Sequence, residues 1–228
     1  MIRAARFELP FEDRVHAASV LADRLVQYHG RDVLVLGIPR GGVPVAAEVA
    51  RKLGADLDVV VARKLGAPQE PELAIGAVTA DGAEFLNEAV VRALDVSEDY
   101  IEGVRRRQMR EAQRRENRFR GDRPAGRIQD RVTILVDDGL ATGATMRAAV
   151  RSVRSRRPRR LVVAVPVGSR EACAALEAEV DEIVCVSVPE PFGAVGHFYR
   201  NFEPVEDAEV DRILREFRSR QAVATTGG

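Results

Sequence analysis

The segment 132–150, VTILVDDGLATGATMRAAV, constrains the fold of this chain more than any other stretch of its sequence. It begins with a run of β-branched and apolar residues, VTILV, of the kind that forms a strand buried on both faces. Two carboxylates, Asp137 and Asp138, follow this run, and a loop of small residues, 139–145, then leads into a helix-compatible segment that starts at Met146. The sequence therefore predicts a strand, a loop and a helix, with an acidic pair at the end of the strand.

The residue types in this loop are those that bind a sugar phosphate. Glycines let the backbone curl around an anion, and the N–H groups of a first helical turn are unpaired and carry partial positive charge. Thr142 and Thr145 can add hydroxyl donors, while Asp137 and Asp138 can accept hydrogen bonds from neighbouring sugar hydroxyls. The alternative is a purely structural turn, because strand–turn–helix units with Gly and Thr in the turn are common.

The order of these parts resembles the PRPP-binding motif of type I phosphoribosyltransferases. These enzymes transfer a 5-phosphoribosyl group from 5-phosphoribosyl 1-pyrophosphate (PRPP) to a nitrogen nucleophile and release pyrophosphate. The resemblance implies that Asp137 and Asp138 are the catalytic carboxylates, which hold the ribose hydroxyls and a Mg²⁺ cofactor, partly through PRPP and water. It also implies that the 5-phosphate is bound by Ala141, Thr142, Gly143, Ala144 and Thr145.

The remaining sequence predicts an α/β fold with a mostly parallel, doubly wound sheet and flanking helices, because strand-like and helix-like segments alternate. The expected strands are 32–37, 56–62, 132–136, 160–167 and 182–188, and the expected helices are 13–29, 43–53, 169–179 and 205–220. Ligands of such sheets bind beyond the carboxyl ends of the strands. The segments 39–42, 63–64 and 137–138 all follow strands, so we expect them to converge.

Two of these segments suit a pyrophosphate group. Arg40, Gly41 and Gly42 resemble the family's pyrophosphate loop, since the glycines let amides face an anion and the next helix adds its dipole. A simple strand–helix turn is the alternative. Lys64, beside Arg63, stands where several family members place a basic residue that reaches pyrophosphate, although such a pair can also be merely solvated. The loop 66–73 matches, by position alone, the flexible loop that closes over PRPP.

Three further regions complete the expected organisation of residues 1–228 as a single phosphoribosyltransferase-like domain, with its core at about 13–188. Two short β pieces flank an Asp-Gly turn within 75–85. A long helical insertion at about 87–120 carries the arginine-rich run Arg105–Arg120, which is either a solvated face or an anion contact. A small C-terminal hood at about 188–204, which precedes the closing helix 205–220, would cover the acceptor. The tail 221–228 is expected to lack fixed structure, and 7–11 is a short leading segment.

The sequence says less about the acceptor than about the PRPP donor. The hood residues Glu190, Phe192 and Tyr199 could contact an aromatic ring, or they could pack the hood against the closing helix. Ala141 stands where 6-oxopurine-specific members carry an aspartate, so the resemblance implies a nitrogenous, nucleobase-like acceptor other than a 6-oxopurine.

Two other functions compete with the transferase. One is a non-catalytic regulatory protein that binds PRPP or a nucleotide, for which the Arg105–Arg120 run is the only sequence support. The other is an unrelated α/β nucleotide-binding enzyme, but the chain lacks a P-loop, a GxSxG elbow and a GxGxxG fingerprint.

The composition limits which partners and which cellular location we expect for this protein. The formal net charge is +0, which gives no overall reason for nucleic-acid or membrane binding, and no apolar run approaches the roughly 20 residues of a membrane span. We therefore expect a cytoplasmic protein whose partners are PRPP, a small nitrogenous acceptor and possible second copies of the chain in a homodimer. The cysteines, Cys173 and Cys185, are expected to be buried thiols, and the three histidines are too scattered for a metal site.

Overall fold

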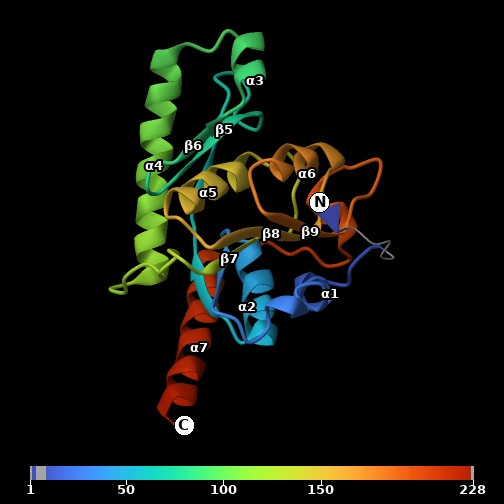
Figure 1. Cartoon of the computed structure of the whole chain (residues 1–228). Helices are drawn as coiled ribbons and strands as arrows, with labels where there is room; N and C mark the ends of the chain where they lie inside the picture. The colour runs from blue at the N-terminus through green and yellow to red at the C-terminus, as the bar shows by residue number, and fades with distance from the viewer. Residues whose placement is uncertain (1, 4–8, 227–228) are drawn as a thin grey trace.

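The computed structural model describes residues 2–3 and 9–226, and it places the side chains of residues 9–219 (Figure 1). Its central element is a six-stranded sheet in the order β1-β9-β8-β7-β2-β3, and every neighbouring pair in it is parallel. The strands are β1 (Ile2–Arg3), β2 (Val33–Gly37), β3 (Asp56–Val59), β7 (Val132–Val136), β8 (Arg160–Val167) and β9 (Glu182–Ser187).

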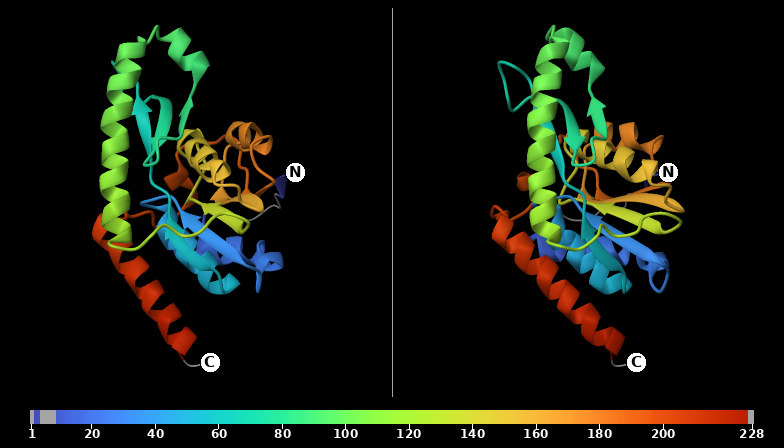
Figure 2. Two further views of the ribbon diagram at one scale, coloured as in Figure 1. Left: turned by 60° about the vertical axis from the view of Figure 1, so that its left-hand side comes forward. Right: turned by 90° about the vertical axis from the view of Figure 1, so that its left-hand side faces the viewer.

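Helices cover both faces of this sheet, as a doubly wound fold requires (Figure 2). One face packs against α1 (Arg14–Asp23), α2 (Gly42–Leu53) and α7 (Asp207–Thr226), and the other against α5 (Ala144–Ser155) and α6 (Arg170–Glu177). Successive residues of a strand point to opposite faces, so Val33 and Val35 enter one core while Leu34 and Leu36 enter the other. The continuous apolar runs of the central strands therefore serve two cores at once.

A second, antiparallel sheet stands beside the central one. It consists of β4 (Ala62–Gly66), β5 (Ala74–Thr79) and β6 (Glu84–Leu86), and it lies between α5 and the long helix α4 (Glu98–Arg120). Its apolar residues form a small core with α4 and with the short helix α3 (Glu88–Ala93). The region 87–120 is thus helical as expected, but it packs on a sheet that the sequence showed only as isolated β pieces.

The hood region lies across the carboxyl end of β7. It contains a single 3₁₀ turn, η2 (Val195–Phe198), and it is joined to the segment before α1 by hydrogen bonds from Phe11 N to Phe198 O and from Arg200 N to Phe11 O, both 2.8 Å long. A Cβ atom on Gly139 would lie 2.4 Å from Val195 Cγ1, so the hood rests directly on the loop after the acidic pair.

The predicted fold class is confirmed, and the expected strands 132–136 and 160–167 match β7 and β8 residue for residue. The segment 13–29 was expected to form one helix. Instead, α1 ends at Asp23, because the N–H groups of Arg24 and Leu25 bond to carbonyls three residues back, and a separate 3₁₀ turn, η1 (Val26–Tyr28), follows.

Other element boundaries also differ from those predicted from the sequence. The strand expected at 56–62 ends at Val59, and Ala62 already belongs to the second sheet. The helix of the 132–150 segment starts at Ala144 rather than Met146. The tail expected to lack structure is helical as far as Thr226, since α7 continues to that residue, whereas 227–228 and part of the leading segment 7–11 lie outside the described residues.

The arginine-rich run of α4 is largely neutralised within the protein. Arg114 and Arg115 pair with Glu111, Arg118 pairs with Asp211, and Arg120 pairs with Asp58. A helix whose arginines are mostly paired in this way offers few free charges to an anion, which weakens the sequence support for the alternative of a regulatory protein. Among the described helices, none is long and apolar enough to cross a membrane.

The side chain of Tyr28 connects η1 to the central sheet, and its ionisation provides a test of this contact. Its hydroxyl donates to Glu182 Oε2 on β9 at 2.5 Å and accepts from Arg160 Nε on β8 at 3.0 Å. Burial, together with the Glu182 carboxylate, raises the pKa of Tyr28 to about 12. An unfolded tyrosine ionises near pH 10, so above that pH the unfolded chain binds fewer protons than the folded chain, and stability falls as pH rises.

We therefore expect Tyr28→Phe to lose its stability disadvantage at high pH. The difference in unfolding free energy between the wild-type chain and this variant should be constant below pH 9 and should shrink by about 1 kcal/mol between pH 10 and 11. Guanidinium denaturation of both proteins at pH 8, 10 and 11 measures it. An unchanged difference over this range would show that Tyr28 ionises normally.

Candidate functional site

The site is built where two neighbouring strands end. Strands β2 and β7 pair in register up to Gly37 and Val136, and Ile38 N then donates to Val136 O at 2.9 Å. The segments 38–42 and 137–143 therefore leave the same edge of the sheet side by side. This is the convergence expected for the carboxyl ends of adjacent parallel strands.

Glycine at positions 41 and 42 allows the first segment to lie against the acidic pair. A Cβ atom on Gly41 would lie 1.9 Å from Asp138 Oδ2, and one on Gly42 would lie 2.7 Å from Val136 O and 2.9 Å from Asp137 Oδ1. No side chain larger than hydrogen fits at either position without displacing its neighbours. The structure thus brings Gly41, Gly42, Asp137 and Asp138 together.

Asp138 is held by two side chains. Arg14 Nε donates to its Oδ2 at 2.8 Å, and the Tyr199 hydroxyl donates to its backbone carbonyl at 2.6 Å. The Arg14 guanidinium also stacks on the ring of Phe202, with 3.8 Å between Cζ and the ring centroid, and its Nη1 donates to Glu203 O. A cation on α1 therefore fixes one carboxylate of the pair, whereas Asp137 makes no ion pair among the described residues.

The two carboxylates have perturbed affinities for protons. Burial and the neighbouring charge of Asp138 raise the pKa of Asp137 well above its usual range. Burial also raises the pKa of Asp138, although the Arg14 guanidinium opposes this shift. Two buried carboxylates beside each other repel when both are charged, so a further cation at this position would stabilise them.

The loop after the acidic pair presents unused backbone donors. In the part of the chain that the structure describes, the N–H groups of residues 142–146 donate no hydrogen bond within the protein. Gly143 precedes the first residue of α5 and has a φ of +78°, a conformation that favours glycine. The loop is anchored from below by Leu140 N, which donates to Val167 O, and by Ser169 Oγ, which donates to Ala141 O at 2.7 Å. These free amides at a helix N-terminus form a cradle for an anion.

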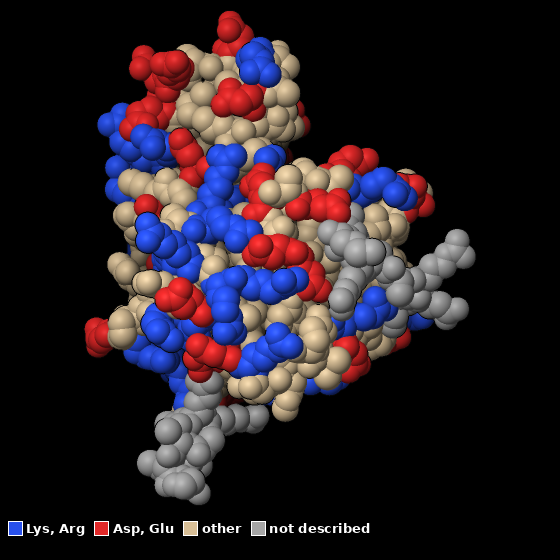
Figure 3. Space-filling view, in the orientation of Figure 1, with Lys and Arg blue, Asp and Glu red and all other residues tan. Residues whose placement is uncertain are grey.

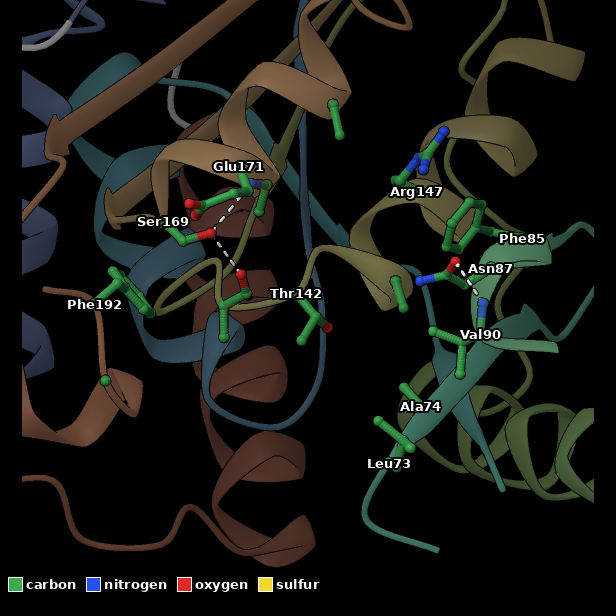
Figure 4. Close-up of a pocket in the computed structure, with 15 residues that line it drawn as sticks. Leu73, Ala74, Phe85, Asn87, Val90, Thr142, Arg147, Ser169, Glu171 and Phe192 are labelled. Carbon is green, nitrogen blue, oxygen red and sulfur yellow. Dashed lines mark hydrogen bonds between the residues drawn. The ribbon is translucent and has the colours of Figure 1, made fainter. Parts of the chain in front are cut away.

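A cavity of about 580 Å³ opens beside this cradle (Figure 4). Thr142 lies in the middle of its wall, with Phe192 and Glu171 on one side and Phe85 and Arg147 on the other. The cavity also reaches Leu73 at the end of the loop 66–73, so the hood, the anion cradle and the second sheet share one space.

The predicted pyrophosphate residues are only partly assembled. The Nη1 atom of Arg40 lies 3.4 Å from Glu206 Oε2 and 3.9 Å from Asp207 Oδ1, so this side chain is directed towards the start of α7. Lys64 Nζ donates to the Glu72 carbonyl and carboxylate, at 2.8 and 2.9 Å, within the adjoining loop. These contacts do not bring Lys64 to the acidic pair.

Arg63 faces a different environment from Lys64. Burial and the positive charge of Arg115 lower its pKa, and its Nε donates to Gln108 Oε1 on α4 at 3.1 Å. Adjacent residues on a strand point to opposite sides. Arg63 is therefore directed towards α4, whereas Lys64 is directed towards the loop 66–73.

Some of the predicted hood residues line the cavity, and others pack within the protein or lie on its surface. Phe192 lines the cavity and packs against Phe198, with 5.0 Å between ring centroids. Tyr199 is buried between Phe11 and Phe202, and Glu190 pairs with Arg170 on the surface. Sequence reasoning did not identify Arg14 as a site residue, since nothing in its local sequence links it to a carboxylate 124 positions away.

The contact between Gly41 and the acidic pair predicts the effect of a single methyl group. Because Arg14 holds Asp138 Oδ2, this oxygen cannot move aside freely, and we expect Gly41→Ala to destabilise the chain by about 1–3 kcal/mol. Gly103→Ala on α4 is the matched control, since its Cβ atom would meet only Arg107 Nη1 at 3.9 Å. This control should stabilise the chain by about 0.5–1 kcal/mol. Chemical denaturation measures both, and equal effects of the two substitutions would contradict the contact.

Comparison with known proteins agrees with this geometry. A protein of Thermus thermophilus, TT1426, has a crystal structure that is 46% identical in sequence, with a TM-score of 0.77 over 92% of this chain and 99% of that one. Two Mycobacterium tuberculosis proteins, from strains CDC 1551 and H37Rv, bear names that assign them provisionally to the phosphoribosyl transferases. Both are 46% identical over 217 residues, which are 93% of this chain and 49% of theirs, so the chain spans about half the length of these relatives.

The match to a family model covers most of the chain. Residues 12–200 match the model of the phosphoribosyl transferase domain, a range that contains α1 with Arg14, the 38–42 segment, the acidic pair, the anion cradle and the hood up to Arg200. The family predicted from the 132–150 segment is thereby confirmed, and the predicted class of enzyme, a transferase, is the class of this family. The chain belongs to the phosphoribosyl transferase domain family.

Proposed function

We propose that this chain transfers the 5-phosphoribosyl group of PRPP to a nitrogenous, nucleobase-like acceptor other than a 6-oxopurine and releases pyrophosphate. The observation that carries this proposal is the juxtaposition of a partly buried acidic pair, Asp137 and Asp138, with the free amides of residues 142–146. One element suits the hydroxyls of a sugar and the other suits its phosphate, and both belong to a single strand–loop–helix unit.

Each part of the substrate has an assigned place in this proposal. The 5-phosphate occupies the cradle of Ala141, Thr142, Gly143, Ala144 and Thr145, and the ribose hydroxyls bind Asp137 and Asp138. The pyrophosphate group lies along the 40–42 segment, whose backbone approaches the acidic pair at Gly41 and Gly42. As C1 of the ribose develops positive charge, the enzyme's task is to hold both ends of PRPP rigidly and to keep the leaving group neutralised.

The acidic pair fits the proposed Mg²⁺ cofactor. No group of three or more Asp, Glu, His or Cys side chains that could hold a metal occurs among the described residues. Mg²⁺ is usually bound by one or two carboxylates together with substrate phosphates and water, which is what Asp137 and Asp138 could offer beside PRPP. When bound, the ion would neutralise oxygens of the departing pyrophosphate.

The acceptor would enter through the cavity beside Thr142. Phe192 offers a ring face on the hood side of this cavity, and Glu171 places a carboxylate at the N-terminal turn of α6. Tyr199 contributes by holding the hood and Asp138 together, because its ring is buried and its hydroxyl is occupied. A cytoplasmic location and a homodimer stay predictions from the sequence.

The decisive experiment is a pyrophosphate-release assay with PRPP and Mg²⁺ across purines, pyrimidines and small amines. We expect release with at least one acceptor and, for Asp137→Asn and Asp138→Asn, a loss of about 10²–10³-fold in kcat. Asp130→Asn is the matched control, because Asp130 is exposed with a φ of +61°, which asparagine tolerates, and it should keep full activity. The proposal would be contradicted if both site variants bound PRPP as the wild-type chain does and no acceptor gave turnover. That result would favour a regulatory protein.

The choice between Lys64 and Arg63 as the pyrophosphate contact can be tested separately. If the loop 66–73 closes over PRPP and releases Lys64 from Glu72, Lys64→Met should raise the KM for PRPP about tenfold or more, with a smaller effect of Arg63→Met. The opposite order would assign the contact to Arg63, whose Nε donates to Gln108 on α4 in the structure. Initial-rate kinetics at varied PRPP concentration distinguish the two outcomes.

A further inference from the structure

A second polar cavity lies at the opposite edge of the central sheet from the candidate site. It has a volume of about 180 Å³ and is enclosed by the start of β3, by the segment 120–131 that connects α4 to β7, and by α7. Its lining residues are Leu34, Asp56, Leu57, Asp58, Arg120, Arg123, Pro124, Gly126, Arg127, Arg131 and Arg218. Five arginines therefore surround a space whose lining contains only two carboxylates.

Both carboxylates are already committed to other partners. Asp58 is buried and accepts from Arg120 Nε at 3.2 Å, and from the backbone N–H groups of Val59 and Gly126 at 2.8 Å each. Asp56 Oδ2 accepts from Arg131 Nη2 at 2.7 Å. Arg120 also pairs with Glu116, and Arg131 also pairs with Asp32, so these two arginines and both carboxylates of the lining already have partners of opposite charge.

The other arginines keep unused donors. The Nε of Arg218 is buried and has no hydrogen-bond partner among the described residues, although Nη2 of the same side chain donates to Phe119 O at 2.8 Å. Within the part of the chain that the structure describes, Arg123 makes no hydrogen bond or ion pair within the protein, and the ion pair of Arg127 is a 3.7 Å contact with Asp32. A buried N–H of a guanidinium without an acceptor costs free energy unless a ligand supplies one.

The positive charges near Arg218 disfavour the charged form of its guanidinium group. Burial and the positive charges of Arg123 and Arg120 lower its pKa, and the carboxylates of Asp58 and Asp211 oppose this effect only in part. Figure 3 shows that Lys and Arg side chains gather on this side of the molecule, over the residues that follow α4 and around the start of β7. An anion in the cavity would relieve the repulsion among these guanidinium groups.

We propose that this cavity binds a phosphoryl group, held by Arg218, Arg123 and Arg127. Guanidinium groups recognise phosphate through paired N–H donors, and an unpaired Nε beside an exposed neighbour provides such donors. The volume of about 180 Å³ is under a third of the 580 Å³ beside Thr142, so it suits a free phosphate or the phosphate end of a small ester rather than a whole nucleotide. The site is independent of the transferase proposal, because it shares no residue with the acidic pair or the anion cradle.

A local reporter separates this site from the anion cradle at residues 141–145. The chain contains no tryptophan, so Pro124→Trp would place a single indole in the cavity wall. We expect inorganic phosphate to change the emission of this indole saturably at constant ionic strength, whereas chloride should not. Titration with ribose 5-phosphate then shows whether free phosphate or an ester binds more tightly.

Variants of the proposed ligands supply the specificity test. In the Pro124→Trp chain, Arg218→Met and Arg123→Met should each weaken phosphate binding about tenfold or more, because each removes a charged donor. Arg215→Met is the matched control, since this exposed arginine lies on the same helix outside the cavity lining, and it should leave the affinity unchanged. Arg123→Met guards against a folding defect, because Arg123 is exposed and makes no hydrogen bond or ion pair with any described residue.

A second measurement avoids the reporter. In the chain without the added tryptophan, phosphate should raise the melting temperature of Arg215→Met more than that of Arg218→Met, because phosphate bound at the candidate site contributes equally to both. Equal melting shifts, or an indole response that chloride reproduces or that survives both Arg218→Met and Arg123→Met, would overturn the proposal.

Discussion

The close approach of the backbone at Gly41 and Gly42 to Asp137 and Asp138 is the contact on which the rest of the candidate site depends. It exists because β2 and β7 are adjacent, parallel and in register to their last residues. Without a Cβ atom in between, the two loops seal the acidic pair from solvent on one side, and Arg14 and Tyr199 seal it on another. The resulting burial raises the pKa of both carboxylates, so a cation placed beside them would relieve their mutual repulsion.

Much of this frame could be predicted from local sequence. The run VTILV and the run Arg160–Val167 match their strands residue for residue, because apolar stretches bounded by charged and turn residues have one placement in a parallel sheet. The position of the anion cradle also followed from sequence, since glycine and threonine before a helix start define it locally. The 38–42 segment could be placed beside it because carboxyl ends of parallel strands share an edge.

The features that could not be predicted from the sequence depend on contacts between segments far apart in the chain. The bond of Arg14 to Asp138 spans 124 positions and that of Tyr199 spans 61, and neither residue type is unusual in its own surroundings. The end of β3 at Val59 was missed for a similar reason. The apolar character continues from Val59 to Ala62, but residues after Val61 pair with β5 in a different sheet, so the break is set by tertiary pairing and not by composition.

The net charge of +0 concealed a separation of charge within the fold. At the carboxyl edge of the sheet, two carboxylates are buried with one arginine, and their local imbalance favours a cation. At the amino edge, five arginines surround a cavity with two aspartates, and their imbalance favours an anion. A total charge sums over both edges and cancels them. Arguments from composition can therefore exclude a uniformly charged surface, but ligand chemistry has to be derived from each cavity by counting which charged groups already have partners.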